Sequence, residues 1–285
     1  MVLVSGCQSL APGTPVVSTV PEQSAVQSPE ISAALPATEP VIDQQPEPPA
    51  DLWQRIQGEL SWQSIDNDKV ARARKYYLRQ HNYLPKVSRG ASLYLYYIVE
   101  EVQARNLPIE IALLPLVEST LDPFSYSHKR AAGMWQIMPA TGKHLGLQQD
   151  WWFDGRRAVR DSTHAALDYL ESLNEDFNGD WMLALAAYNS GKSRVRRVQA
   201  ANRRKGLPTD YWSLKLPRET REYVPRLLAL THIVANPEYY GVEMPHVANA
   251  PAFEVVETGG QIELVRAAEL AEVSLETLRA LNPVC

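Results

Sequence analysis

Residues Leu107–Gly142 read LPIEIALLPLVESTLDPFSYSHKRAAGMWQIMPATG, and the carboxylate of Glu118 ends the apolar run within them. Charged side chains are seldom buried unless they have a partner or a task. Leu116 and Val117 flank this acid, so we expect partial desolvation to raise its pKa and keep it protonated near neutrality. A general acid needs this property. The alternative is an ordinary surface Glu at a helix end.

The same run predicts a helix over 107–119, with Pro108 in its first turn and Pro115 bending or tightening it just before Glu118. Apolar residues at helical spacing, with strand-like alternation almost absent before residue 250, predict a mainly α fold. The other expected helices span residues 51–60, 67–80, 89–106, 180–202 and 217–236, and one more is capped by Asp161.

Three segments differ in composition. Residues 1–50 are rich in Pro, Ser, Ala and Thr and are expected to form an extended tether. Residues 51–248 are expected to form one helical domain, with a motif-bearing core at 107–235. Residues 249–285 predict a short strand followed by two helices.

Charge and composition restrict the possible partners. The 285 residues carry a formal net charge of -5 with a pI near 5.7, which gives no reason to expect a nucleic-acid partner. We expect a monomer without a cofactor. We also expect no metal, because the six histidines show no ligand spacing and Cys is scarce.

Four elements stand in order along the chain, namely ESTLDPFSYS, GMWQIMP, AAYNSG and PRETREYV, and the first of them begins at Glu118. Ser119 comes next, Ser127 stands nine residues after Glu118, and GMWQ begins six residues later at Gly133. AYNSG covers Ala187–Gly191, and Tyr223 lies in ETREYV. This set resembles the lytic transglycosylase family with the lysozyme-type fold, glycoside hydrolase family 23. The sequence departs from the family pattern at Met134–Trp135, where the family has Leu-Met, and Tyr223 is the loosest match.

The resemblance implies an enzyme that cleaves the β-1,4 bond between N-acetylmuramic acid and N-acetylglucosamine of peptidoglycan and forms 1,6-anhydromuramic acid products without water. It also implies a lysozyme-like all-α domain. Glu118 would be the catalytic acid and base. Gly133 would permit close approach of the backbone to the ligand, and Met134 would pack a subsite wall. The implied substrate-binding residues are Ser127, Met134, Gln136, Tyr188, Asn189 and Tyr223. For the AYNSG stretch, a helix end with Gly191 as left-handed cap is an equally compatible reading.

No second acid is singled out by spacing. Asp122 precedes Pro123, which favours a turn role, and Asp150, Asp154 and Asp161 remain possible on distance alone. One working carboxyl suits a reaction in which the acetamido group and hydroxyl of the substrate assist. The rival readings are a hydrolysing muramidase on the same fold and a catalytically inactive murein-binding lipoprotein.

Cys7 follows LVSG, which resembles a bacterial lipobox. The resemblance implies a lipid anchor on Cys7. The residue after this cysteine is Gln8 rather than Asp, which resembles the pattern of lipoproteins sorted to the Gram-negative outer membrane. A periplasmic enzyme anchored to that membrane is therefore expected. The apolar stretch is short for a complete signal peptide, so the native chain is expected to begin upstream. A chance cysteine is the alternative.

Three further features keep two readings each. The βαα pattern after residue 249, ending in LNP, resembles part of a LysM carbohydrate-binding repeat without its closing strand, and a small capping appendage is the alternative. Trp151 and Trp152 are expected either to stack on sugar rings or to pack in the core. The basic runs in residues 191–206 predict a solvated helix face, with contact to peptide carboxylates of peptidoglycan as the alternative.

Overall fold

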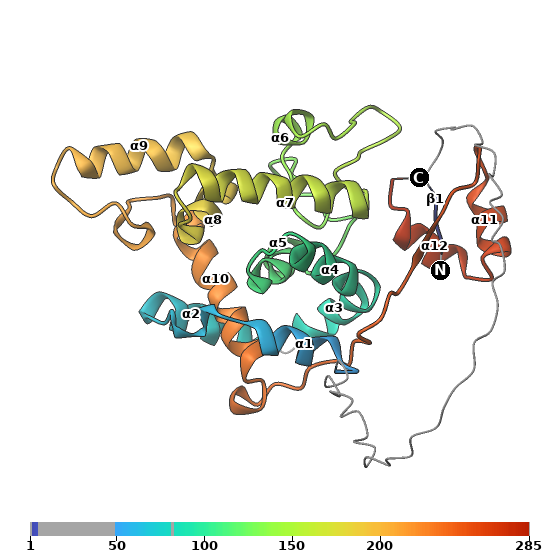
Figure 1. Ribbon diagram of the computed structural model, residues 1–285, viewed down its shortest axis with the longest axis horizontal. Helices are drawn as coiled ribbons and strands as arrows, with labels where there is room; N and C mark the ends of the chain where they lie inside the picture. The colour runs from blue at the N-terminus through green and yellow to red at the C-terminus, as the bar shows by residue number, and fades with distance from the viewer. Residues whose placement is uncertain (1, 5–48, 81–82, 285) are drawn as a thin grey trace, which may run out of the picture.

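The computed structural model describes residues 2–4, 49–80 and 83–284, so Cys7 and nearly all of the expected tether lie outside the described residues. Within this part of the chain the protein is mainly helical (Figure 1). The N-terminal half contains α1 (Leu52–Glu59), η1 (Trp62–Ser64), α2 (Asp68–Leu78), α3 (Tyr83–Gly90), the π-helical η2 (Ala91–Leu95), α4 (Tyr96–Ala104), η3 (Ile109–Leu113) and α5 (Leu114–Ser119).

The second half of the main domain contains α6 (Pro139–His144), α7 (Val159–Asp176), α8 (Trp181–Ser190), α9 (Lys192–Arg203), η4 (Tyr211–Ser213), α10 (Arg218–Ala235) and η5 (Glu238–Tyr240). Side-chain caps begin several helices. Asp51 accepts a hydrogen bond from the Trp53 amide, and Asp180 accepts one from the Leu183 amide.

Helix α10 is the centre of the core. Between Tyr223 and Val234 every side chain except Arg226 is buried, and the helix packs against α1, α2, α5, α8, η1 and η3. A helix that is apolar on nearly all sides must be covered on nearly all sides. The elements on either side of the chain's midpoint are therefore packed around one buried helix.

Two sequence expectations about helix bounds need correction. The helix expected to be capped by Asp161 begins at Val159, with Ala158 as its N-cap. The helix expected over 180–202 is two helices, because Gly191 has φ +89 and ψ 133, values that no helix and no left-handed cap adopts.

The C-terminal segment has the expected strand and helices. They are β2 (Glu254–Val256), α11 (Leu264–Leu270) and α12 (Leu275–Leu281), and β2 pairs in parallel with β1 (Val2–Val4). The segment lies at one end of the molecule and forms a small apolar cluster of its own (Figure 1). It contacts the main domain where the Tyr94 hydroxyl donates to the Ala280 carbonyl at 2.7 Å and Arg89 pairs with Glu276. Among the described residues, no helix is both long and apolar enough to cross a bilayer.

Candidate active site

A cleft of about 300 Å³ opens beside the end of α5. It brings together five of the residues that the sequence singles out, from four separate parts of the chain: Glu118, Ser127, Gln136, Tyr188 and Asn189. The motif residues, spread over more than seventy positions, therefore converge on one site. Ile137, Met138, Thr141 and Tyr169 add to its walls.

Glu118 occupies this cleft with its carboxyl held by a tyrosine. The Tyr223 hydroxyl donates to Glu118 Oε1 at 2.5 Å, and the Tyr223 side chain is buried. Burial among apolar groups raises the pKa of Glu118 to about 8, the hydrogen bond from Tyr223 acts to lower it, and the charge of Glu219 raises it. The carboxyl is thus mostly protonated at neutral pH, as its apolar approach predicts.

A second acid in the same run shows the contrast. Glu110 is completely buried, and its Oε1 accepts hydrogen bonds from the backbone amides of Ser61 at 2.6 Å and Trp62 at 2.7 Å. Glu110 therefore has a structural task, since it satisfies the amides at the start of η1. Glu118 lines a cleft instead, and the described residues give its carboxyl a single side-chain donor.

The backbone around Glu118 is fixed from both sides. The helix expected over 107–119 is instead the 3₁₀ helix η3 followed by α5, so the tightening lies before Pro115, which stands in the first turn of α5, and not just before Glu118. Two left-handed residues, Thr120 and Leu121, follow α5. The Tyr83 hydroxyl donates to the Leu116 carbonyl at 3.0 Å. Ser119 Oγ donates to the Met134 carbonyl at 2.9 Å and so ties the acid to the GMWQ turn.

The GMWQ turn is held by its neighbours. Trp135 is buried and donates to Thr163 Oγ1 at 3.0 Å, while its carbonyl accepts from the Tyr188 hydroxyl at 2.8 Å. Gln136, at φ +47, donates to the Gly133 carbonyl at 2.9 Å. Tyr188 thus positions the turn as well as lining the cleft.

Two expectations about this turn are corrected. Met134 is completely buried and does not line the cleft, so Met138, which is 42% exposed, provides the methionine surface there. The close approach at Gly133 is to protein rather than to ligand, because a Cβ built there would lie 1.9 Å from the Arg156 carbonyl oxygen.

The serine loop makes its own hydrogen bond. Ser127 Oγ accepts from the Ala131 amide at 2.9 Å, which leaves the hydroxyl hydrogen to donate into the cleft. No hydrogen bond joins Ser127 to Glu118 among the described residues. Both side chains line the cleft, but they do not contact each other through a hydrogen bond.

The acids weighed from spacing lie elsewhere. Asp122 Oδ1 accepts from the Phe124 amide at 2.9 Å, which confirms the turn role. Asp150 accepts from the Trp152 and Phe153 amides, Asp154 pairs with Arg156, and Asp161 stands in the first turn of α7. None of the four is a lining residue of the cleft.

Sequence reasoning missed a carboxylate that does line the cleft. Glu219 pairs with Lys129 at 2.5 Å, and both side chains are mostly exposed at the cleft rim. The signal was present in ETREYV, because Glu219 and Tyr223 are four residues apart and so share a helix face.

Trp151 and Trp152 are 81% and 79% exposed, so the core-packing alternative is wrong for both.

Tyr223→Phe is expected to raise the pKa of Glu118 above its value of about 8, because the variant removes the hydrogen bond that lowers it. The measurement is a ¹³C NMR titration of the glutamate carboxyls, with Glu118 assigned by its loss in Glu118→Gln. Tyr97→Phe, which removes a hydroxyl bonded to His164, is the matched control and should leave this titration unchanged. An unchanged or lowered pKa in Tyr223→Phe would contradict the assigned role of the hydrogen bond.

The chain matches a known domain family and is similar to several known proteins. Residues 96–209 match the transglycosylase SLT domain. The chain is 43% identical over 235 residues to membrane-bound lytic murein transglycosylase D of Escherichia coli (strain K12), a match that covers 82% of this chain and 52% of that protein. It is 41% identical over 169 residues to a putative tributyltin chloride resistance protein of Alteromonas sp. (strain M-1), covering 59% of this chain and 80% of that one.

The chain therefore spans about half the length of its Escherichia coli relative. A solved structure of lytic transglycosylase Slt from Pseudomonas aeruginosa is also similar, with 25% identity and a TM-score of 0.39 over 52% of this chain and 25% of that one. That structural similarity is too low to support an argument. The domain match and the sequence relatives are sufficient: the chain belongs to the lytic transglycosylase family that is defined by the transglycosylase SLT domain.

Proposed function

We propose that this protein is a peptidoglycan lytic transglycosylase. It cleaves the β-1,4 bond between N-acetylmuramic acid and N-acetylglucosamine and forms 1,6-anhydromuramic acid without consuming water. The observation that carries the proposal is Glu118, a carboxyl in a cleft whose pKa is raised to about 8 by burial. At neutral pH such a group is a ready proton donor for a leaving sugar.

In the first step Glu118 protonates the bridging oxygen. Tyr223 donates to Oε1 of Glu118, so the acidic proton is carried by Oε2 and can be directed at the substrate. The bond from the anomeric carbon of N-acetylmuramic acid to the bridging oxygen then breaks. The acetamido group of the same sugar stabilises the positive charge that develops at the anomeric carbon.

In the second step Glu118 acts as the base. The 6-hydroxyl oxygen of the sugar bonds to the anomeric carbon while its proton returns to Glu118, which restores the enzyme. The hydrogen bond from Tyr223 lowers the pKa of Glu118 and so stabilises the carboxylate that exists between the two steps. Intramolecular attack carries a large effective-molarity advantage, so the reaction needs no second carboxylate to activate water.

The remaining cleft residues are assigned by their donors and acceptors. Ser127 would donate to the 6-hydroxyl or the acetamido oxygen. Gln136, Tyr188 and Asn189 would hold the acetamido group and the sugar hydroxyls. Met134 is proposed only as a buried support behind the turn, since it has no surface in the cleft.

A hydrolysing muramidase is the second candidate, and Glu219 is the observation that favours it. Inverting glycosidases use a second carboxylate to activate water on the opposite face of the sugar. Glu219 is engaged by Lys129, however, and its exposed position at the rim places it in bulk solvent rather than beside a confined water. We therefore favour the transglycosylase.

Product analysis separates these candidates. Mass spectrometry of sacculi digested with the full chain should yield muropeptides that end in 1,6-anhydromuramic acid. Products with reducing ends would identify a hydrolase. Binding to sacculi without any soluble product would identify a catalytically inactive scaffold.

Localisation and domain organisation are proposed from sequence. We propose that Cys7 is lipid-modified and that residues 8–50 tether the domain 51–248 to the periplasmic face of a Gram-negative outer membrane. The name of the Escherichia coli relative, which is membrane-bound, supports this. Intact-mass analysis of the N-terminal peptide would show the added acyl chains, and an unmodified Cys7 would contradict the anchor.

The C-terminal residues 249–285 are proposed as a degenerate LysM-like unit on a monomeric enzyme. The observed β2, α11 and α12 follow the order expected for such a unit. Pull-down of the full chain on chitin-type glycan, compared with a chain ending at residue 248, tests glycan binding. Light scattering tests the monomer.

A further inference from the structure

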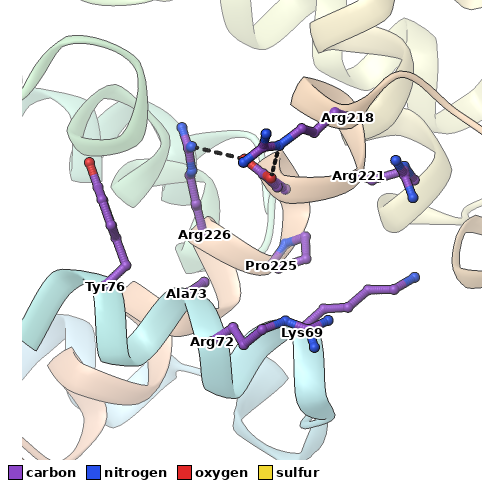
Figure 2. A pocket seen from close by; sticks show the side chains of 9 residues that line it. Lys69, Arg72, Ala73, Tyr76, Arg218, Arg221, Pro225 and Arg226 are labelled. Carbon is purple, nitrogen blue, oxygen red and sulfur yellow. Dashed lines mark hydrogen bonds and ion pairs between the residues drawn. The ribbon is translucent and has the colours of Figure 1, made fainter.

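A basic hollow of about 460 Å³ lies between α2 and α10 (Figure 2). It shares no lining residue with the cleft that contains Glu118. Basic side chains reach into the hollow from both helices. They are Lys69 and Arg72 from α2, and Arg218, Arg221 and Arg226 from α10. Among the described residues that line the hollow, Glu222 is the only acid, so the lining carries a net charge of about +4 in a chain whose formal net charge is -5.

The charges in the hollow are only partly compensated. Glu222 pairs with Arg218 at 2.7 Å and with Arg226 at 3.3 Å. Arg72 and Arg221 are exposed, and neither guanidinium makes a hydrogen bond or ion pair with a described residue. Like charges that gather in a concave surface raise the local concentration of anions. The uncompensated guanidiniums identify the hollow as a site for an anion.

The walls of the hollow favour a carboxylate-bearing chain over a membrane surface. Tyr76 exposes 52% of its surface at the edge, with the Arg226 guanidinium 5.8 Å from its ring centroid. The site is concave, whereas a flat bilayer would reach only its rim. Guanidinium groups bind planar carboxylates through two parallel hydrogen bonds, which suits an acidic peptide.

The position of the hollow connects it to the cleft. Glu219 lines the cleft from α10, and Tyr223, one turn later, donates a hydrogen bond to Glu118. Arg218 and Arg221 line the hollow from the same two turns of the helix. A helix with its side chains is about 10–12 Å across. An extended peptide of four residues spans about 13 Å, so a peptide attached to a sugar in the cleft can reach the hollow.

We propose that the hollow between α2 and α10 binds the acidic peptide stems of peptidoglycan while the glycan strand occupies the cleft. This inference rests on the proposed function for the choice of polymer. Arg72 and Arg221 contact stem carboxylates, and Lys69 adds a charge on the same wall. The site makes stem-bearing strands better substrates than bare glycan.

The test compares two substrates with one enzyme chain. Uncrosslinked glycan strands are used either with their stems or after removal of the stems by an amidase. In Arg72→Gln/Arg221→Gln, kcat/KM on stem-bearing strands should fall about tenfold through a higher KM, as expected for the loss of two charge-assisted contacts. The same variant should cleave stripped strands as the wild type does. Both substitutions are on exposed helix positions, where Gln is well tolerated.

A matched control removes the same charge elsewhere. Arg197→Gln/Arg203→Gln changes two exposed arginines of α9 that do not line the hollow, and it should leave both substrates unaffected. A loss in this control equal to that of the test variant would show that general charge, or the basic face of α9, attracts the stems. That result would overturn the proposal.

A binding measurement keeps the inference separate from catalysis. Calorimetric titration with a free stem tetrapeptide should give about tenfold weaker binding for the Arg72→Gln/Arg221→Gln variant, and the wild-type affinity should fall with added salt. Absent binding, or an equal loss of cleavage on stripped strands, overturns the stem site. Loss of binding to anionic lipid vesicles without a stem effect would assign the hollow to lipid headgroups. Failure of the proposed function appears differently, as absent cleavage of both substrates by the wild type.

Discussion

Glu118→Gln is expected to lower the rate of glycan cleavage by about 10³-fold, because an amide of the same shape can neither give nor take the proton that both steps require. The measurement is release of 1,6-anhydro muropeptides from sacculi, quantified by mass spectrometry. The variant should still bind sacculi, because the other cleft residues remain. Retention of more than a tenth of the wild-type rate would exclude Glu118 as the acid and base.

The same variant has an expected effect on stability that serves as its folding control. The pKa of Glu118 is raised from 4.5 to about 8 in the folded protein. A raised pKa stabilises the fold fully below pH 4.5, and this contribution is lost as the pH rises through about 8. At pH 8 the neutral Gln should therefore be more stable than the wild type, by roughly 4 kcal/mol. At pH 4 the two should unfold alike, and an equal difference at both pH values would contradict the raised pKa.

Gly133→Ala is expected to destabilise the protein by about 4 kcal/mol, because the new Cβ would lie 1.9 Å from the Arg156 carbonyl oxygen at a position with φ +79. The atom it meets belongs to the backbone and cannot rotate away. The measurement is urea unfolding followed by circular dichroism. Because the clash is at the base of the GMWQ turn, cleavage should fall along with stability.

Gly146→Ala is the matched control for this effect. Gly146 has the same φ of +79, but a Cβ built there meets nothing within 4 Å. Its substitution should cost only the strain of a left-handed Ala, about 1 kcal/mol. If the two variants are equally destabilised, strain rather than the contact with Arg156 explains the need for glycine at 133.

Much of the cleft could be predicted from the sequence because the motif residues lie where helices end. Glu118 is in the last turn of α5, and Asn189 is in the last turn of α8. Side chains at such positions lie beside the loops that follow them, and loops carry most binding residues. Spacing along the chain therefore anticipated which polar side chains would share a surface.

Side chains of the GMWQ turn could not be assigned in this way. A turn presents alternate residues to opposite sides, and only packing shows which side is solvent. Met134 proved to be buried, whereas Gln136 lines the cleft at φ +47. The sequence indicates that the backbone at Gly133 is approached closely, but the group that approaches it is the Arg156 carbonyl. Arg156 lies on a loop whose path no local sequence pattern predicts.

The sequence by itself determined the helical fold, the apolar approach to Glu118 and the family to which the chain belongs, since these depend on local periodicity and on motif order. Tertiary structure alone decided the electrostatics. The pKa of Glu118 depends on burial and on Tyr223, which is 105 positions away along the chain. The basic hollow exists only because α2 packs against α10. Both effects act between groups that are close in space, and distance along the chain does not enter Coulomb's law or the cost of desolvation.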